Sequence, residues 1–260
     1  MSRPGLILLF LWLAGNVAGQ DSRMYEKHWL INDGDTLPYR LLLPEQYDPG
    51  KKYPLLIFLH GSGERGTDNE KQLVHGADLF TRDSIRKNYP AIVVFPQCPV
   101  SSSWSNAKFL YDSSKRRTGF IFSAEDPPTL AMKLLLELLH ELSDNYSLDK
   151  NRFYVGGLSM GGMGTFELVA RKPKIFAAAF PVCGGGDTLS GKKLKKTCWW
   201  IFHGLKDDVV PPQLSISMAD AIRRHHGRVR LSLYPEANHN SWDAAFAEKE
   251  LLHWLFAQHK

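Results

Sequence analysis

Apolar residues in this chain form short continuous runs that alternate with segments of helical periodicity. Five of the runs contain no polar residue, as expected for parallel strands that are covered on both faces. They lie at residues 55–59, 91–95, 153–155, 176–180 and 199–202. Residues 229–234 alternate between apolar and polar side chains, which favours a more exposed strand. The pattern therefore predicts a mostly parallel sheet.

Two further strands are predicted ahead of these runs, at residues 24–30 and 37–43. The segment between them contains Asn32-Asp33-Gly34-Asp35, a strong turn sequence. The two strands should therefore pair as an antiparallel amino-terminal hairpin.

The clearest helix is predicted over residues 127–146, where Asp126 can cap the first turn and Pro127 suits the first helical position. Its apolar face is a leucine repeat at every fourth position, formed by Leu130, Leu134, Leu138 and Leu142. Residues 218–226 and 242–259 are two further helical segments. Strands and helices in alternation predict an α/β sandwich with helices on both faces of the sheet. Reactive groups in such sheets gather outside the carboxyl ends of the strands.

The pentapeptide G-L-S-M-G at residues 157–161 is the strongest chemical signal in the chain. It follows a strand-like run at residues 152–155 and precedes a helix-like segment at residues 165–170. A G-x-S-x-G sequence in a strand-turn-helix context forms a sharp turn that exposes the serine hydroxyl. Ser159 is therefore the candidate nucleophile, and the surrounding glycines leave room for the strand and helix to approach.

A serine nucleophile needs a base and an acid that orients this base, in the chain order Ser, Asp or Glu, His for this type of turn. The sequence H-G-L-K-D-D follows the strand at residues 199–202, and we predict Asp207 as the acid because it occupies the H-G-x-x-D position. The alternative is Asp208, and a turn or helix cap accounts for whichever aspartate is not used. His239 follows the next strand and is the predicted base. The alternative for His239 is an ordinary surface histidine.

Acyl transfer also requires backbone amides that stabilise the developing oxyanion. The amide of Met160, directly after the nucleophile, is one candidate. The second is the amide of Ser62, in the glycine-rich loop at residues 60–66 that follows the first parallel strand. His60 opens this loop, and we expect it to fix the loop through a hydrogen bond.

Residues 101–125 show little periodicity and are expected to lie over the site as a pocket wall or lid. Trp104 within this segment and Trp242, three residues after His239, are candidates for lining the substrate pocket. The alternative for Trp242 is to pack the last helix on the sheet. A small site with an aromatic wall favours short-chain acyl groups or hydroxycinnamoyl (feruloyl-type) esters.

The amino terminus has one basic residue, Arg3, an apolar stretch over residues 6–14, and a small-residue cleavage sequence at residues 17–19. These features predict a secretory signal peptide at residues 1–19, a single domain at residues 20–260, and a secreted or periplasmic protein. The apolar stretch is shorter than the roughly 20 residues of a membrane span, which disfavours a stable membrane anchor.

The formal net charge is +5 at pH 7, but the basic residues are scattered apart from the run at residues 192–196. This run has no interleaved aromatic residues, so we expect a solvated face and no nucleic-acid partner. The three cysteines lack metal-binding spacing, and no H-E-x-x-H or phosphate-loop sequence occurs. We therefore expect neither a metal nor another cofactor. The pattern does not indicate the oligomeric state.

Five segments together resemble the secreted bacterial carboxylesterases of the α/β-hydrolase superfamily, in a group often labelled predicted peptidases. The segments are HGSGERGTDN at 60–69, FPQCP at 95–99, GLSMGGMGT at 157–165, FAAAFPVCGGGD at 176–187 and HNSW at 239–242. Feruloyl esterases and polyhydroxybutyrate depolymerases are more distant relatives. The resemblance spans residue 37 to the end. It implies a serine esterase acting on a small-molecule or polysaccharide-linked ester, with a serine peptidase or an inactive binding protein of the same fold as alternatives.

Overall fold

The computed structural model describes residues 22–114 and 117–260, and an eight-stranded sheet forms its centre. The ten strands in the described residues are β1 (Glu26–Asn32), β2 (Asp35–Leu42), β3 (Tyr53–Leu59), β4 (Ile92–Pro96), β5 (Lys108–Tyr111), β6 (Arg117–Ile121), β7 (Leu148–Leu158), β8 (Ala178–Val182), β9 (Cys198–Gly204) and β10 (Val229–Tyr234). The order in the large sheet is β1-β2-β4-β3-β7-β8-β9-β10. Strand β2 runs antiparallel to both its neighbours, and β4 and the strands beyond it run parallel. The predicted mostly parallel sheet is therefore confirmed.

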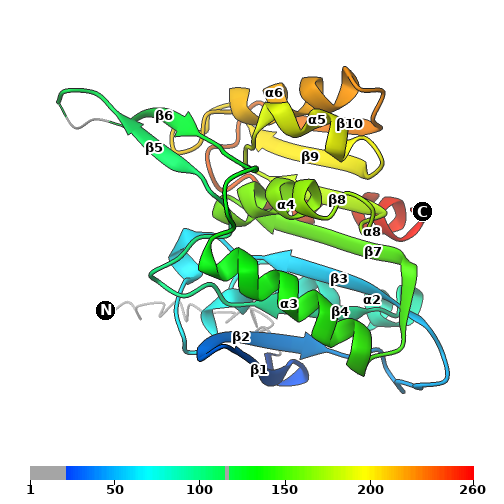
Figure 1. Ribbon diagram of the computed structural model, residues 1–260. Helices are drawn as coiled ribbons and strands as arrows, with labels where there is room; N and C mark the ends of the chain where they lie inside the picture. Colours follow the sequence, from blue (N-terminus) through cyan, green and yellow to red (C-terminus); the bar gives the residue numbers. More distant parts are fainter. Residues whose placement is uncertain (1–21, 115–116) are drawn as a thin grey trace, which may run out of the picture.

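Helices cover both faces of this sheet, as Figure 1 shows. They are α1 (Ala77–Thr81), α2 (Asp83–Asn88), α3 (Leu130–Asn145), α4 (Met160–Arg171), α5 (Gly191–Leu194), α6 (Gln213–Arg223), α7 (Trp242–Phe246) and α8 (Leu251–Phe256). Buried residues of α3, α4 and α6 form one hydrophobic core with the sheet, and buried residues of α1, α7 and α8 form the other. Neighbouring residues of β3 serve opposite cores, Ile57 the first and Phe58 the second. This double coverage explains why the central strands are continuous apolar runs.

The amino-terminal hairpin is present as predicted, with Asn32 paired to Asp35 across a two-residue turn. Both turn residues have positive φ angles, 52° at Asp33 and 86° at Gly34. An Asp-Gly pair suits this turn because both residues tolerate the left-handed region. The predicted signal peptide, residues 1–19, lies outside the described residues.

The helix predicted over residues 127–146 begins at Leu130, and its cap is Thr129 in place of Asp126. The Thr129 hydroxyl accepts a hydrogen bond from the Met132 amide at 3.1 Å. Two consecutive prolines at 127 and 128 explain the later start, because a residue before proline is disfavoured in helical conformation. The first turn is thus closed by threonine, a good capping residue.

The helix predicted over residues 242–259 is divided into α7 and α8. Residues 247–250 form the break, and they include neither glycine nor proline. Ala245 of α7 and Leu251 of α8 are both buried in the same core. The two short helices therefore pack on one face of the sheet with a turn that the sequence does not mark.

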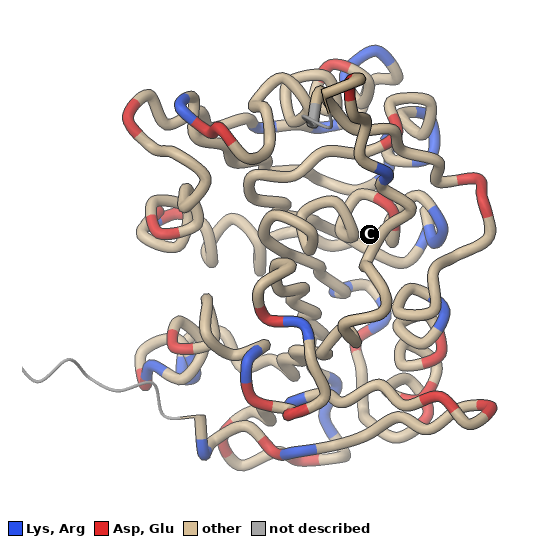
Figure 2. The backbone as a smooth tube through the Cα atoms, turned by 90° about the vertical axis from the view of Figure 1, so that its left-hand side faces the viewer, with Lys and Arg blue, Asp and Glu red and all other residues tan. Residues whose placement is uncertain are grey.

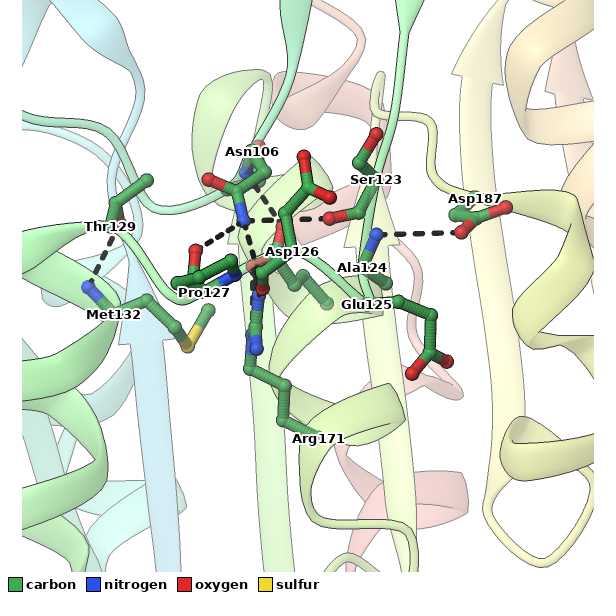
Figure 3. Close-up of polar contacts among 12 residues, drawn as sticks. Asn106, Ser123, Ala124, Glu125, Asp126, Pro127, Thr129, Met132, Arg171 and Asp187 are labelled. Carbon is green, nitrogen blue, oxygen red and sulfur yellow. Dashed lines mark hydrogen bonds and ion pairs between the residues drawn. The ribbon is translucent and has the colours of Figure 1, made fainter.

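Strands β5 and β6 form a separate antiparallel hairpin that projects from the body of the molecule (Figure 1). Its base is fixed by Asn106, whose side-chain amide donates to the carbonyl oxygens of Ser123, Asp126 and Pro127 (Figure 3). The Asn106 backbone amide donates to Glu167 on α4 at 2.7 Å. The hairpin is therefore attached to the helix that follows Ser159.

Charges of both signs are interspersed along the side of the molecule shown in Figure 2, without a broad region of one sign. All three cysteines are buried and unbridged. Within residues 22–114 and 117–260, no helix combines the length and apolar character needed to cross a membrane.

Candidate active site

Ser159 lies in a tight turn between the end of β7 and the start of α4. Its φ angle is 54° and its ψ angle is −116°, a conformation that non-glycine residues rarely adopt. A Cβ atom at Gly161 would lie 1.9 Å from the Leu59 carbonyl oxygen, and one at Gly157 would lie 2.4 Å from the Gly161 oxygen. Only glycine fits at these two positions. The backbone therefore holds the serine hydroxyl at the carboxyl end of the sheet.

The structure brings Ser159, His239 and Asp207 into one chain of hydrogen bonds. The Ser159 hydroxyl oxygen lies 2.9 Å from His239 Nε2, and His239 Nδ1 lies 2.8 Å from Asp207 Oδ2. His239 comes from the loop after β10 and Asp207 from the loop after β9, so the ends of β7, β9 and β10 supply the three residues. In this arrangement His239 Nδ1 donates to the carboxylate and Nε2 can accept the serine proton.

Asp207 is buried, and each of its two carboxylate oxygens has a different set of partners. Oδ1 accepts from the amides of Val209 and Val210 at 2.9 and 2.8 Å, while Oδ2 faces His239 and His203. Burial alone would raise the pKa of Asp207, but hydrogen bonds from the two histidines and the Val210 amide outweigh it and hold the pKa well below its usual range. Asp208 is exposed, and its amide donates to the Asn238 side chain.

His203 is a second histidine on the Asp207 carboxylate, which the sequence pattern did not assign. Its Nε2 lies 3.1 Å from Asp207 Oδ2 and 2.9 Å from the Val210 carbonyl oxygen. Its Nδ1 lies 2.7 Å from the Ser215 hydroxyl oxygen, and this hydroxyl donates its single hydrogen to the Gly184 carbonyl. Both ring nitrogens of His203 therefore have hydrogen-bond partners. The available sequence signal for His203 was its position as the histidine of the H-G-x-x-D pattern.

Ser62 and Met160 line the same cavity as Ser159, which has a volume of about 240 Å³. The Met160 amide begins α4 and so has no partner within that helix. Ser62 begins the short helical turn η2 (Ser62–Glu64) in the loop after β3. His60 fixes this loop as expected, with Nδ1 donating to the Gly61 carbonyl at 2.6 Å and Nε2 accepting from the Cys98 amide at 2.9 Å.

One wall of the cavity comes from the β5–β6 hairpin and its connection to β4. Phe109 and Phe120 are cross-strand partners with ring centroids 5.2 Å apart. The residues that line the cavity are Ser62, Arg65, Ser103, Ala107, Phe109, Phe120, Ser159, Met160, Met163, Val209 and Val210. The segment at 101–125 thus contributes a pocket wall, and its apolar pairs at 109–110 and 120–121 were the available signal.

Neither predicted tryptophan lines this cavity. Trp104 is fully buried and meets His60 edge to face at 5.4 Å, so it supports the loop from beneath and has no surface to offer a substrate. This corrects the expectation for Trp104. Trp242 packs against His239 at 5.6 Å and against His75 at 5.1 Å. It also packs against the hydrophobic core that α7 and α8 form with the sheet, which agrees with the alternative of packing the last helix on the sheet.

Among the described residues, Cys183, Asp207 and His239 form a group of possible metal ligands within 4.8 Å of one another. The two last-named side chains are already hydrogen bonded to each other. Burial raises the pKa of the Cys183 thiol well above its usual value, which disfavours the thiolate that binds metal ions. A metal at this position would have to displace the bond between Asp207 and His239.

Several solved structures are similar to this fold. A thermostable esterase is 34% identical, with a TM-score of 0.81 over 92% of this chain and 64% of the other. A ferulic acid esterase from Anaeromyces mucronatus, solved in complex with ferulic acid, has a TM-score of 0.63 at 16% identity and covers 90% of both chains. The latter likeness shows the fold alone.

Sequence relatives include lysophospholipase-like protein 1 from Mus musculus, 30% identical over 52% of this chain and 55% of its own length. A poly(3-hydroxybutyrate) depolymerase from Ralstonia pickettii is 29% identical over 50% of this chain. This chain spans about half of the first relative and 25% of the second.

Two family models match the chain. The prolyl oligopeptidase family matches residues 189–259 only. The family described as "Putative esterase" matches residues 34–213, which include the loop with Ser62, the turn with Ser159 and the acid Asp207. The match covers well over half of the sequence, and the chain therefore belongs to this esterase family.

Proposed function

We propose that this protein is a carboxylic ester hydrolase that works through an acyl-enzyme on Ser159. The observation that carries the proposal is the unbroken hydrogen-bond chain from Ser159 through His239 to Asp207, which opens on a cavity of about 240 Å³. The serine oxygen attacks the ester carbonyl carbon while His239 Nε2 takes its proton. The same proton then passes to the departing alcohol.

The developing oxyanion is held by the amides of Ser62 and Met160 in this proposal. Both residues line the cavity, and the Met160 amide lies at the start of α4, where the helix dipole favours negative charge. Water enters after the alcohol leaves, gives a proton to His239 and attacks the acyl carbon. Breakdown of the second tetrahedral intermediate returns the proton to Ser159 and releases the acid.

The proposed substrates are esters of short-chain or aromatic acids, of the feruloyl type, as small molecules or linked to polysaccharide. The cavity is smaller than most drug-sized pockets and has two aromatic side chains in its wall, Phe109 and Phe120. A long acyl chain would need a longer apolar trough. The ferulic acid complex of a protein with the same fold supports an aromatic acid as one candidate.

We further propose that the protein is exported, which would make polymer-linked esters accessible to it. Support comes from the apolar stretch and cleavage sequence within residues 1–19. A serine peptidase is the second candidate activity, because the prolyl oligopeptidase match includes Asp207 and His239.

The decisive experiment compares wild type with Ser159→Ala on para-nitrophenyl acetate and on the matched para-nitroanilide. We expect ester hydrolysis in the wild type and a loss of about 10⁴-fold to 10⁶-fold in kcat for the variant, with unchanged circular dichroism. If the variant retains more than a tenth of the wild-type activity, Ser159 is not the nucleophile. Faster cleavage of the anilide than of the ester would favour the peptidase.

A further inference from the structure

The cavity beside Ser159 contains one residue whose role the acyl-enzyme mechanism does not explain. Arg65 lies in the same glycine-rich loop as Ser62 and lines the cavity together with the nucleophile. It is the one charged residue among the described residues of the lining, and the others are apolar, aromatic or hydroxyl-bearing. The cavity therefore presents a positive charge to whatever occupies it.

The hydrogen bonds of Arg65 hold the guanidinium in place without neutralising it. Nε donates to the Ser62 carbonyl at 3.0 Å, and Nη1 donates to the carbonyls of Val100 and Ser102 at 3.1 and 3.4 Å. All three acceptors are uncharged. Within the part of the chain that the structure describes, Arg65 has no carboxylate partner and Nη2 has no acceptor.

The acidic residues nearest in sequence are directed elsewhere. Glu64 is mostly buried, with Oε1 3.8 Å from His75 Nε2 and Oε2 4.0 Å from His60 Nδ1. Asp68 accepts hydrogen bonds from Gln97 and from the amides of Glu70 and Lys71. Neither residue lines the cavity.

We propose that Arg65 selects esters that carry a carboxylate close to the scissile bond, on either the acyl or the alcohol group. The two N–H groups on Nη2 can donate to a carboxylate, and such charge-assisted hydrogen bonds are stronger than neutral ones. Arg65 and Ser159 line the same cavity of about 240 Å³, so a substrate that fills the cavity reaches both residues. The substrate class is then an aromatic or short-chain ester with a free acid group. This inference rests on the proposed esterase activity and narrows its substrates.

The test uses two matched substrate pairs. Para-acetoxybenzoate and its methyl ester place the carboxylate on the leaving group. The para-nitrophenyl monoester of terephthalate and its methyl ester place it on the acyl group. For each pair we take the ratio of kcat/KM for the anionic ester to kcat/KM for the neutral ester. This ratio is compared between the wild type and each variant, so that the different intrinsic reactivities of the two esters cancel.

We expect Arg65→Gln to lower this ratio by about fivefold to twentyfold in at least one pair, as for loss of a partly exposed charged hydrogen bond. Arg65→Lys keeps the charge and should retain part of the preference. Raising sodium chloride from about 0.05 M to about 0.5 M should lower the wild-type ratio and leave that of Arg65→Gln unchanged. Arg82→Gln removes one positive charge outside the cavity and is the matched control.

A role confined to holding the loop would lower kcat/KM for both members of a pair by the same factor. Unchanged ratios in both pairs would therefore overturn the proposal, even if Arg65→Gln is slow. A second measurement does not require turnover: monomethyl terephthalate should bind Ser159→Ala more tightly than it binds the double variant with Arg65→Gln. Equal affinities would also overturn the proposal. If the wild type hydrolyses none of these esters, the proposed esterase activity itself is rejected.

Discussion

At the scale of single residues, Asp207 performs two tasks that the sequence presented as alternatives. Its Oδ1 caps the turn through the amides of Val209 and Val210, and its Oδ2 receives His239 and His203. The side chain that caps the turn is thus also the acid of the proposed triad. The neighbouring aspartate, exposed to solvent, has neither role among these contacts.

We predict that Asp207→Asn lowers kcat/KM by about 10³-fold to 10⁴-fold, while Asp208→Asn changes it by less than about threefold. An amide in place of the carboxylate removes the charge that stabilises the imidazolium and presents a donor to His239. Steady-state kinetics on para-nitrophenyl acetate measure both variants. A larger loss in Asp208→Asn would move the role of the acid to that residue.

His60 should make the folded state sensitive to acid. Burial lowers the pKa of His60 to about 4, while the unfolded chain has the ordinary value of 6.5. Between these values the unfolded state binds more protons, so the free energy of unfolding decreases as the pH falls. From about pH 7 to about pH 5 the loss due to this residue is about 2 kcal/mol.

Urea unfolding of wild type and His60→Gln at the two pH values measures this effect. Glutamine keeps an acceptor for the Cys98 amide but does not titrate. The variant should be less stable at neutral pH and should lose less stability on acidification. Equal losses in the two proteins would show that His60 does not cause the pH dependence.

Single residues were predictable where a chemical pattern fixes both residue type and chain order. Ser159, Asp207 and His239 followed from the strained turn, the H-G-x-x-D position and the order of the strands, and the structure places them within hydrogen-bond distance. Trp104 was not predictable in the same way. An aromatic residue in an irregular segment has the same sequence signal whether it lies on the surface or beneath a loop, and depth depends on the whole fold.

At the scale of elements, the β5–β6 hairpin converts an irregular stretch into a wall of the cavity. Its base is anchored on α4, where Glu167 accepts from the Asn106 amide and also pairs with Arg171 at 2.7 Å. Arg171 in turn donates to the Asp126 carbonyl at 2.7 Å (Figure 3). The helix that presents Ser159 thus also positions Phe109 and Phe120.

We predict that Phe109→Ala raises KM for an aromatic ester such as para-nitrophenyl ferulate by about fivefold or more, and changes KM for the acetate far less. The aromatic ring that stacks with an aromatic acyl group would be lost. Leu110→Ala is the control, because Leu110 is the next residue on the same strand and does not line the cavity. Equal effects of the two variants on the ferulate ester would contradict this pocket.

The strands were more predictable than the helix ends. Burial on both faces makes a continuous apolar run from each central strand, and only a parallel sheet between helices produces many such runs in alternation. Helix ends depend on a single capping hydrogen bond, and both Asp126 and Thr129 are suitable caps by type. The break between α7 and α8 carries no marker residue and follows from packing on the sheet.

At the scale of the whole molecule, the order of the strands in the sheet could not be predicted from the pattern of apolar and polar residues. Alternation predicts the layers, but the crossover by which β4 lies outside β3 depends on how the connections pack. This order puts the ends of β7, β9 and β10 near one another and so unites residues 159, 207 and 239. The proposed activity therefore depends on the strand order of the complete sheet.

Export is a property of the complete chain, and we predict cleavage after Gly19. Production in a bacterial host with a Sec pathway, followed by amino-terminal sequencing of the periplasmic fraction, should give a chain that begins at Gln20. Replacing Leu9 and Leu11 by arginine should retain the protein in the cytoplasm with its amino terminus intact. Cytoplasmic wild-type protein that still begins at Met1 would reject the prediction.

The β5–β6 hairpin has a consequence for how the proposed activity can diversify. Among the described residues its two strands pair only with each other, in a sheet separate from the one that holds the strand ends with Ser159, Asp207 and His239. Mutations in the hairpin can therefore accumulate, or a different loop can replace it, without changing the register of the central sheet. The proposed catalytic residues can in this way be combined with different substrate preferences, and a laboratory library confined to this hairpin should yield new specificities at little cost in stability.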